Sequence, residues 1–321
     1  MNNIEVSIII IAYNEQETIG TCIKSLIEVF NSIEESYEII LIDSGSSDDT
    51  IKIAQKYPIK IFKYSNGEKN ASISRYFGLN KSFGKYILHV DGDIVIDKNW
   101  IVSALNIIKN NENLGAIGGY LSEKYNDGSF SEYRFPVNRK YVNEDSISGL
   151  ALFRKDAIIE AGNWNINLRS GEEVDLSLRI MYEAGYDIWL IPQRMGIHYT
   201  EKLGSVKNFY NHLKSNRLIA TGILFRLSRF KLKYLKFHLK RSDEIVIQFP
   251  IMFAYFSSVF IYLPFILIVL IFDILYSYSK RGNIKQAIIM FFTTKLYAMG
   301  TLYGFLCPIK HKKIGKVYKL N

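Results

Sequence analysis

Cysteine and proline are both scarce in this chain. Only two cysteines, Cys22 and Cys307, occur among 321 residues. They provide neither a disulfide framework nor the spacing of metal ligands, and they fit a reducing compartment. Six prolines, together with 48% hydrophobic and 14% aromatic residues, exclude a chain that is disordered as a whole. The length is sufficient for one large domain or for a domain with an appendage.

Acidic residues are nearly absent from the last third of the chain. Residues 226–321 hold 16 Lys and Arg against 3 Asp and Glu, whereas residues 1–225 hold 24 against 28. The net charge of +9 therefore belongs to the last third, which is also the most apolar part. A basic patch can bind nucleic acid, but a patch that is both basic and apolar favours an anionic membrane surface. We expect anionic membrane lipids, and no nucleic acid, as partners.

A basic leader is also lacking before the first apolar run. The run Val6–Ala12 is too short for a secretory signal and follows no Lys or Arg, so it is expected to be a strand. The first 95 residues then alternate between strand-like and helix-like patterns. Strands are predicted at residues 6–11, 38–42, 59–64 and 86–90, and helices at 17–30, 50–57 and 71–81. This rhythm predicts an α/β fold with a parallel sheet and helices on both faces.

Polar loops follow three of these predicted strands. They are Ala12–Glu15, Asp43–Asp49 and Asp91–Asp93. Ligands on such sheets bind at the carboxyl ends of the strands, where all three loops are expected. In the third loop, Asp91 and Asp93 point to the same side of an extended backbone. Their oxygens suit Mg²⁺ or Mn²⁺, which bind one or two carboxylates together with substrate phosphates. Asp-Gly is also common in turns, which is the alternative explanation.

Four motifs occur in an order that resembles a known family. They are Ile11–Glu15, Asp43–Thr50, Asp91-Gly92-Asp93 and Gly171–Leu176. In this order, and at the expected strand ends, they resemble family 2 glycosyltransferases, whose GT-A fold is a Rossmann-like nucleotide-diphospho-sugar transferase fold. The resemblance covers about residues 4–225. It implies an inverting enzyme that transfers a sugar from a nucleotide-diphosphate donor to an acceptor hydroxyl.

The resemblance also implies roles for individual residues. Mn²⁺ or Mg²⁺ is the implied cofactor, because a divalent cation offsets the charge that grows on the leaving group. Asp93 is the implied metal ligand and His198 a further ligand, while Asp91 orients the ribose or the metal's water shell. The implied nucleotide-sugar-binding residues are Ala12, Tyr13, Glu15, Asp43, Arg75, Asp91 and Gly92.

Several of these residues have a second explanation. His198 could be a hydrogen-bonded histidine at a strand end, and Asp43 a turn or N-cap residue. Glu15 could be a favourable charge near a helix N-terminus. Arg75 matches a family arginine near the diphosphate, but Tyr76 stands where the family more often has Asn. An exposed helix arginine is the alternative there.

The catalytic base is predicted to be Glu173. Family members usually place an Asp second in a Glu-Asp pair at a helix start, and here the pair is Glu172-Glu173. A base needs a carboxylate near the acceptor hydroxyl. Ser170 to Glu173 also fits a capping box, in which Glu173 would bind backbone instead. Asp175 is then the fallback base.

The last third contains a basic stretch followed by a long apolar run. Residues 226–241 carry seven Lys and Arg, no acid, and interleaved Leu and Phe, which favours a membrane-surface helix. Residues 245–272 contain no charged residue. As one straight helix they would span about 42 Å, which is more than the roughly 30 Å thickness of the hydrocarbon core of a membrane. Pro250 and Pro264 could break this helix, and basic residues flank both sides, so a hairpin or re-entrant pair fits better than one crossing.

Together these observations predict two domains and one function. Residues 1–225 are expected to form the GT-A domain, and residues 226–321 a basic amphipathic and hydrophobic membrane-attachment region. The predicted enzyme lies at the cell membrane with its catalytic domain in the cytoplasm, and its acceptor is a lipid-linked or surface glycan. The alternative is a catalytically silent GT-A-like membrane scaffold. A nicotinamide dehydrogenase is excluded because no G-x-G-x-x-G follows the first strand.

Overall fold

The computed structural model describes residues 4–65, 70–132, 139–140, 147, 149–201, 210, 219–228, 231–261, 265–306 and 316–320. The chain forms two compact units. The sheet unit comprises Met1–Leu168, Glu172–Lys202 and Lys310–Asn321, and the helical unit comprises Arg169–Gly171 and Leu203–Ile309. Compared with the predicted domains, residues 203–225 group with the helices and the last twelve residues group with the sheet.

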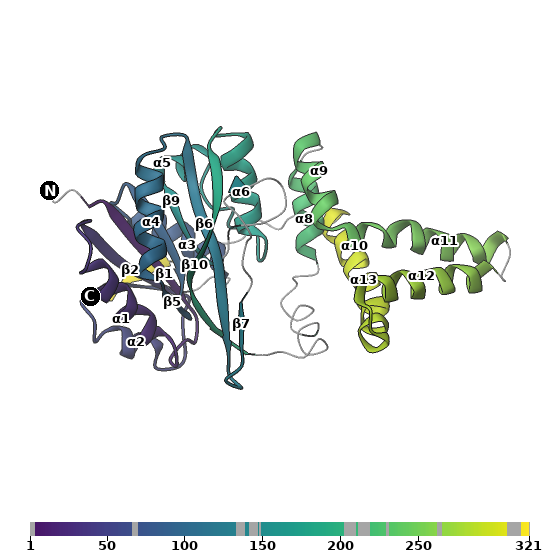
Figure 1. Ribbon diagram of the computed structural model, residues 1–321, viewed down its shortest axis with the longest axis horizontal. Coiled ribbons are helices and arrows are strands. Elements are labelled where there is room, and N and C mark those ends of the chain that lie inside the picture. Colours follow the sequence, from purple (N-terminus) through teal and green to yellow (C-terminus); the bar gives the residue numbers. More distant parts are fainter. Residues whose placement is uncertain are drawn as a thin grey trace. The chain divides into compact units, whose positions relative to one another are not determined.

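The sheet unit begins with alternating strands and helices, as the apolar patterns predict (Figure 1). The elements are β1 (Val6–Ala12), α1 (Ile19–Phe30), β2 (Tyr37–Asp43), α2 (Thr50–Ala54), β3 (Lys60–Ser65), α3 (Ala71–Lys81) and β4 (Tyr86–Asp91). They continue with β5 (Ile94–Ile96), α4 (Lys98–Lys109), β6 (Leu114–Tyr125), β7 (Phe130–Glu132), β8 (Arg139–Lys140), β9 (Leu150–Arg154), α5 (Lys155–Glu160), α6 (Glu172–Tyr182) and β10 (Asp187–Thr200).

A further strand, β11 (Lys316–Lys319), joins these strands in one mixed sheet. The strand order is β11-β3-β2-β1-β4-β9-β6-β10-β5. Strands β1 to β4 are mutually parallel, which confirms the prediction for this half. That prediction covered these four strands alone. Beyond them the sheet is mixed, because β9 runs antiparallel between β4 and β6, and β5 runs antiparallel to β10. A short apolar run such as Leu150–Phe153 fits a buried strand of either direction, so its sequence carries no sign of this reversal.

Helices cover both faces of the sheet. Ile8 and Ile10 of β1 share one apolar core with residues of α1, α2 and α4. The intervening Ile9 points to the other face, because neighbouring side chains of a strand alternate. There it contacts α3 so closely that a Cβ on Gly78 would lie 2.2 Å from its Cγ2. The two-sided burial explains why β1 is an unbroken β-branched run.

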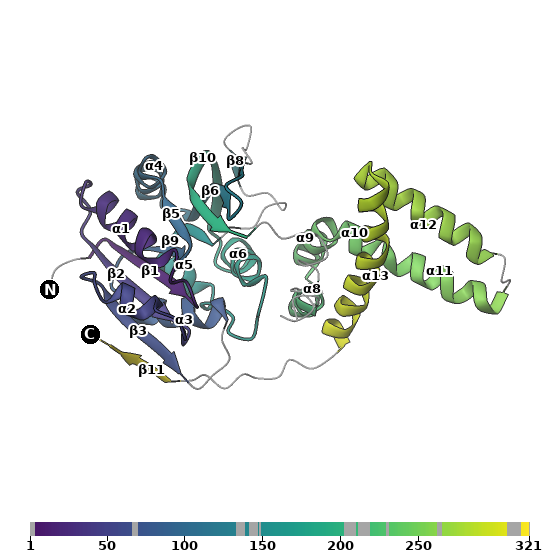
Figure 2. The ribbon, with the colours of Figure 1, turned by 90° about the horizontal axis from the view of Figure 1, so that it is seen from below.

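The end of the chain returns to the sheet (Figure 2). Strand β11 (Lys316–Lys319) pairs antiparallel with β3, and Leu320 N donates to Ile61 O at 2.9 Å. The edge strand β3 is thereby covered along part of its length. Since exposed strand edges pair readily with other chains, this pairing protects the sheet from edge-to-edge association.

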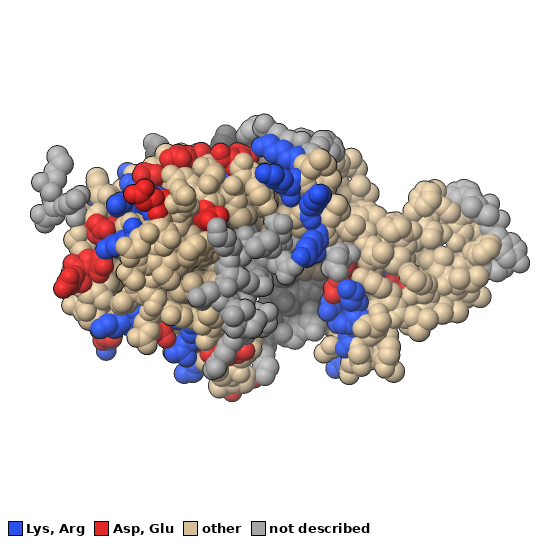
Figure 3. Space-filling model, turned by 45° about the horizontal axis from the view of Figure 1, so that its top comes forward, with Lys and Arg blue, Asp and Glu red and all other residues tan. Residues whose placement is uncertain are grey.

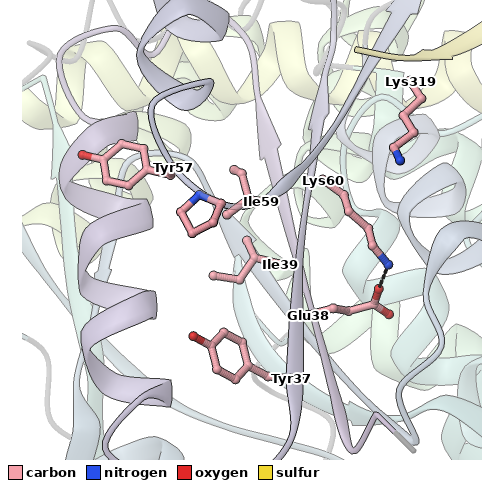
Figure 4. A pocket seen from close by; sticks show the side chains of 8 residues that line it. Tyr37, Glu38, Ile39, Tyr57, Ile59, Lys60 and Lys319 are labelled. Atoms are coloured by element: carbon pink, nitrogen blue, oxygen red, sulfur yellow. Dashed lines mark hydrogen bonds and ion pairs between the residues drawn. The ribbon is translucent and has the colours of Figure 1, made fainter. Parts of the chain in front are cut away.

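A pocket of about 410 Å³ lies where β2 and β3 begin, the opposite end of these strands from the polar loops (Figure 4). Its lining residues are Tyr37, Glu38, Ile39, Tyr57, Pro58, Ile59, Lys60 and Lys319. Lys60 Nζ and Glu38 Oε2, both from its lining, are 2.6 Å apart. None of the predicted site residues belongs to this pocket, and the ion pair explains its polar wall without a ligand.

The helical unit consists of α8 (Ala220–Leu227), α9 (Leu232–Arg241), α10 (Asp243–Val246), α11 (Gln248–Ile261), α12 (Phe265–Arg281) and α13 (Ile284–Leu306). The apolar run 245–272 is therefore divided among three helices. Pro250 lies in the first turn of α11, where proline is tolerated, while Pro264 lies outside the described residues. Among the described helices, none combines the length and the apolarity that a membrane crossing requires.

Glycines allow two of these helices to pack closely. A Cβ on Gly222 of α8 would lie 1.9 Å from Thr301 O of α13, and one on Gly304 would lie 2.2 Å from Ile219 O. Only a residue without a side chain fits at either position. Gly222 and Gly304 therefore fix the contact of α8 with α13.

Candidate active site

The loops after β1 and β2 are joined by reciprocal hydrogen bonds. Asn14 adopts a left-handed backbone, with φ of 58°. Its N–H donates to Ser46 Oγ, and its side-chain oxygen accepts from Ser47 N, both at 2.9 Å. Glu15 N donates to Thr50 Oγ1 at 2.8 Å. These bonds hold the two predicted donor-binding loops side by side at the carboxyl ends of their strands.

Asp43 is fully buried and shapes the second loop. Its Oδ1 accepts from Gly45 N and from Ser46 N, each at 2.9 Å, and its Oδ2 accepts from Ser46 Oγ. The turn role considered for Asp43 is thus present in the structure. Its predicted contact with the nucleoside stays a prediction.

Ala12, Tyr13 and Glu15 lie at the same edge of the sheet. Ala12 is buried beside Asp43, and Tyr13 is 46% exposed. The pKa of Glu15 is raised to about 7, mainly because the side chain is buried and, to a smaller extent, because the negative charge of Asp93 is near. Glu15 therefore faces the carboxylates of the third loop as well as the helix start.

The third loop brings Asp91 against two elements from distant parts of the sequence. Asp91 Oδ1 accepts from Arg75 Nη2 at 2.9 Å. On its other side, a Cβ on Gly149 would lie 1.9 Å from Asp91 Oδ2, so only glycine fits there. Gly92 N donates to Ile11 O at 3.0 Å and places the loop against the end of β1. Burial raises the pKa of Asp91 to about 6; Arg75 opposes the rise, and Asp93 adds to it.

Asp93 and His198 form a pair of potential metal ligands. Asp93 Oδ2 and His198 Nε2 are 3.1 Å apart, and Tyr199 N donates to Asp93 O at 2.9 Å. Asp93 Oδ1 is buried without a hydrogen-bond partner. A carboxylate oxygen and an imidazole nitrogen that converge, next to a second unsatisfied oxygen, suit a divalent cation. The hydrogen bond in which Asp93 accepts from His198 raises the pKa of His198.

The described residues contain no cluster of three or more acidic, histidine or cysteine ligands for a metal. Asp93 and His198 alone would leave most of the cation's coordination positions to water and substrate. Mg²⁺ in particular usually binds through one or two carboxylates and the phosphates of its substrate. The pair therefore fits a cation that the donor helps to hold.

Arg75 is the centre of the site. It is 2% exposed, so the alternative of an exposed helix arginine is wrong. Besides Asp91, its guanidinium donates to Glu172 Oε1 at 2.9 Å and to Glu173 Oε1 at 2.8 Å. Burial opposes its charge, but the surrounding carboxylates raise the pKa of Arg75 above its usual value. Its predicted contact with a donor diphosphate stays a prediction.

Glu172 and Glu173 differ in their surroundings. The side chain of Glu172 is 5% exposed and its Oε2 is buried without a partner, whereas the side chain of Glu173 is 21% exposed. The pKa of Glu172 is raised to about 7, mainly because the side chain is buried and, to a smaller extent, because the negative charge of Glu173 is near. Glu173 is therefore the more accessible carboxylate. Helix α6 begins at Glu172, so Glu173 is its second residue and not the third, which the capping box with Ser170 requires. Its Oε1 accepts from Arg75 instead, and the carboxylate is therefore directed toward Arg75.

Asp175, the fallback base, has other partners. It is buried, and its Oδ2 accepts from Arg179 Nε at 3.0 Å and from Nη2 at 2.7 Å. Arg179 also donates to Asn163 O at 2.7 Å. Asp175 thus joins α6 to the loop after α5 through Arg179.

Two aromatic residues under Arg75 were not expected from the sequence. The guanidinium lies 5.1 Å from the ring centre of Trp164, and Trp164 Nε1 donates to His89 Nε2 at 3.2 Å. Burial holds the pKa of His89 well below its usual value, so His89 is the neutral acceptor of this bond. One signal was present: His89 is the only polar residue in the predicted strand 86–90.

The site and its fold define a class of protein. Loops at the carboxyl ends of β1, β2 and β4, an acidic loop that suits a cation, and carboxylates at the start of α6 are the parts that a nucleotide-diphospho-sugar transferase of GT-A type requires. A family model described as "Glycosyl transferase family 2" matches residues 7–162. Over these residues, just under half of the chain, the sheet unit is similar to family 2 glycosyltransferases.

Curated relatives and solved structures agree with this class. An uncharacterized glycosyltransferase of Rickettsia bellii is 31% identical over 195 residues, which are 56% of this chain and 27% of the relative. Glycosyltransferase AglE of Haloferax volcanii is 26% identical over 215 residues, 63% of this chain and 69% of the relative. The structure of S. aureus TarS 1-349 in complex with UDP-GlcNAc is 18% identical with a TM-score of 0.52, and the match covers 69% of this chain and 67% of that one. This structural likeness concerns the fold.

Proposed function

We propose that this chain transfers a sugar from a nucleoside-diphosphate sugar to an acceptor hydroxyl, with inversion at the anomeric carbon. The observation that carries this proposal is the meeting of donor-side and acceptor-side groups at Arg75. Its guanidinium holds Asp91, at the end of β4, and Glu173, at the start of α6, by bonds of 2.9 and 2.8 Å. UDP-GlcNAc in the TarS structure supports a nucleotide sugar as the donor class.

Glu173 is proposed to act as the general base. Its accessible carboxylate takes the proton of the acceptor hydroxyl while that oxygen bonds to the anomeric carbon and the nucleoside diphosphate leaves from the opposite face. Arg75 fixes the direction of this carboxylate before substrate binds, which removes part of the entropic barrier. The buried Glu172 accepts from the same Nη1 of Arg75 and helps to keep it in place.

Asp93 and His198 are proposed to hold Mn²⁺ or Mg²⁺ together with the donor. The cation, when bound, supplies positive charge where the leaving diphosphate becomes more negative. Asp91 orients the donor's ribose or the water around the cation. The loops after β1 and β2 hold the nucleoside, with Tyr13 as a stacking surface and Asp43 as the residue that sets the shape of the second loop.

The acceptor is proposed to be a lipid-linked or surface glycan at the cytoplasmic face of the cell membrane. Nucleotide sugars are available in the cytoplasm, and the basic, apolar last third of the chain favours attachment to an anionic membrane. A scaffold without activity would have the same attachment but no turnover.

The test is turnover with a panel of nucleotide sugars. The purified chain is incubated with each donor, with Mn²⁺ or with a chelator, and release of nucleoside diphosphate is measured with and without membrane extract as acceptor. Cation-dependent release with one donor supports the proposal. Donor binding without release by any nucleotide sugar, with the extract present, would show a silent scaffold instead.

A further inference from the structure

In helix α12, as far as Ser277, the buried side chains are polar and most of the large apolar side chains are exposed. Of its 17 residues, the buried ones are Asp273 and Ser277. The exposed fractions are 62% for Leu267, 58% for Ile271 and 60% for Leu275. In a protein surrounded by water the distribution is the reverse, because burying apolar surface is what stabilises the fold.

The neighbouring helices share this inversion. In α11, Gln248 is fully buried, whereas Phe253 and Phe256 are 70% and 64% exposed. In α13, the buried residues are small or polar, apart from one methionine: Ala287, Met290, Thr294, Ala298, Thr301 and Gly304. Large apolar side chains of α13, including Phe292 and Leu306, are more than half exposed. The surface of α11 and α12 shows few charged side chains, whereas many are visible on the sheet unit (Figure 3).

An ion pair joins the three helices in their interior. Asp273 of α12 is fully buried, and its Oδ2 lies 2.6 Å from Lys295 Nζ of α13. Tyr255 of α11 donates its hydroxyl to the same oxygen at 3.3 Å. Asp273 Oδ1 and Ser277 Oγ are buried without partners. Polar groups of this kind hold helices together where apolar packing gives no advantage over the solvent, which is the situation in lipid.

Positive charge accompanies the apolar surface. On α9, Lys233, Lys236 and Lys240 are exposed, as are the leucines Leu232 and Leu239. The three acids of residues 226–321 are Asp243, Glu244 and the buried Asp273, and Glu244 lies 2.7 Å from Arg281. A surface of lysines and leucines complements anionic lipid headgroups.

We propose that the outer surface of α11, α12 and α13 contacts lipid acyl chains directly, with the lysines of α9 at the level of anionic headgroups. A second protein would cover one face of one helix, but here large apolar side chains are exposed on all three helices and the polar groups lie between them. The occupant that fits this arrangement is a membrane. The inference deepens the membrane attachment proposed above and identifies the residues that make it, and it is independent of the reaction at Arg75.

The test places a fluorophore on this surface. In full-length protein with Cys307→Ser, Ile271→Cys is labelled with the polarity-sensitive dye NBD, and Phe130→Cys serves as the matched control. Phe130 is 52% exposed in the sheet unit, and the remaining Cys22 is buried and does not react. Vesicles of phosphatidylcholine with phosphatidylglycerol should shift the emission of the label at 271 to the blue, and lipids with quenchers in their acyl chains should quench it. The control label should not respond.

A second variant tests the same surface by binding. Leu267→Glu with Ile271→Glu should weaken partition into these vesicles about a hundredfold, since two apolar side chains lose their contact with lipid. Release of nucleoside diphosphate in detergent should be unchanged, because neither residue belongs to the site. Wild-type protein that binds vesicles but releases no nucleoside diphosphate would contradict the proposed function alone.

Two outcomes would overturn the lipid assignment. One is a label at 271 that stays accessible to aqueous iodide when the protein is bound to vesicles. The other is a label at 271 that is shielded in lipid-free protein together with a doubled molecular mass, which would show that a second copy of the chain covers this surface.

Discussion

Arg75 on α3 donates a 2.8 Å hydrogen bond to Glu173, the second residue of α6. The two residues are 98 positions apart in the chain. Because Arg75 also holds Asp91 at 2.9 Å, one buried cation connects the acidic loop after β4 with the proposed base. Asp91, Glu172 and Glu173 all accept from the guanidinium of Arg75, so displacing one of these carboxylates should shift the positions of the other two.

Replacing Glu173 with Gln tests the proposed base. The side chain keeps its size and one acceptor for Arg75 but cannot take a proton. Turnover should fall by roughly 10² or more, in line with general-base contributions, while the affinity for donor and the melting temperature change little. Steady-state release of nucleoside diphosphate and a thermal melt with donor provide the two measurements.

The matched control for this variant is Asp175→Asn. Asp175 is bound to Arg179, so the substitution should lower the melting temperature and leave most of the turnover of the folded protein. An active Glu173→Gln enzyme together with an inactive, stable Asp175→Asn enzyme would contradict the assignment and make Asp175 the base.

Removing a proposed cation ligand should abolish the dependence of the enzyme on the metal while the protein stays folded. Asp93→Ala deletes one of two convergent donors, so Mn²⁺ should no longer strengthen binding of nucleoside diphosphate, and turnover should be lost. Chelation of the wild-type protein should have the same effect on turnover. Titration calorimetry with UDP or GDP, with and without Mn²⁺, measures the difference.

Asp156→Ala, an exposed acid in the first turn of α5, is the control for loss of one negative charge. It should keep the Mn²⁺ dependence. If Asp93→Ala keeps it as well, the assignment of the Asp91-Gly92-Asp93 loop to a cation is wrong.

Local elements of the fold were predictable because their signals are local. Helix α3 begins at Ala71 and ends at Lys81, as predicted, and Asn70 caps it by accepting from Ile73 N at 2.7 Å. The direction of β9 and the pairing of β11 with β3 depend on contacts between distant segments. The lysine-rich end of the chain gives no apolar run that would indicate a strand.

The site was predictable at the level of motifs and not at the level of partners. The loops after β1, β2 and β4 meet because parallel strands end at one edge, which the sequence pattern indicates. Burial of Arg75 depends on three carboxylates 16, 97 and 98 residues away. Nothing near Arg75 in sequence shows that these carboxylates would surround it.

Loss of the charge of Arg75 should destabilise the sheet unit strongly. Arg75→Met leaves Asp91, Glu172 and Glu173 crowded without a cation, and removal of one partner of a buried ion pair costs about 3–5 kcal/mol. Arg194→Met is the control, because the bridge of Arg194 to Asp97 is 38% exposed on the Arg side and should contribute no more than about 1 kcal/mol. Urea unfolding of both variants checks the difference, and equal losses would contradict the central role of Arg75.

Deleting residues 316–321 should uncover the edge of β3. The ladder with β11 and the bond from Leu320 N to Ile61 O would be lost, at about 1 kcal/mol for each hydrogen bond. The free edge should also promote association between chains. Light scattering on warming and the melting temperature are the measurements, and Lys319→Ser, which keeps the backbone, is the control. A deletion variant that melts and scatters like wild type would show that β11 does not protect the sheet.

The ion pair of Asp273 and Lys295 should matter more when one partner is removed than when both are replaced. Asp273→Asn leaves Lys295 with a neutral partner in the interior of the helical unit, which should cost about 3 kcal/mol, the lower end of the range for breaking a buried pair. Asp273→Leu with Lys295→Met replaces both charges with apolar groups of similar size and should be close to neutral, because no unpaired charge stays buried. Hydrogen exchange of residues 265–306 in the full-length protein, in detergent, measures the local stability. The single variant should exchange faster than wild type and the double variant at nearly the wild-type rate. If the double variant exchanges as fast as the single one, the pair itself holds the three helices together and apolar packing between them cannot replace it.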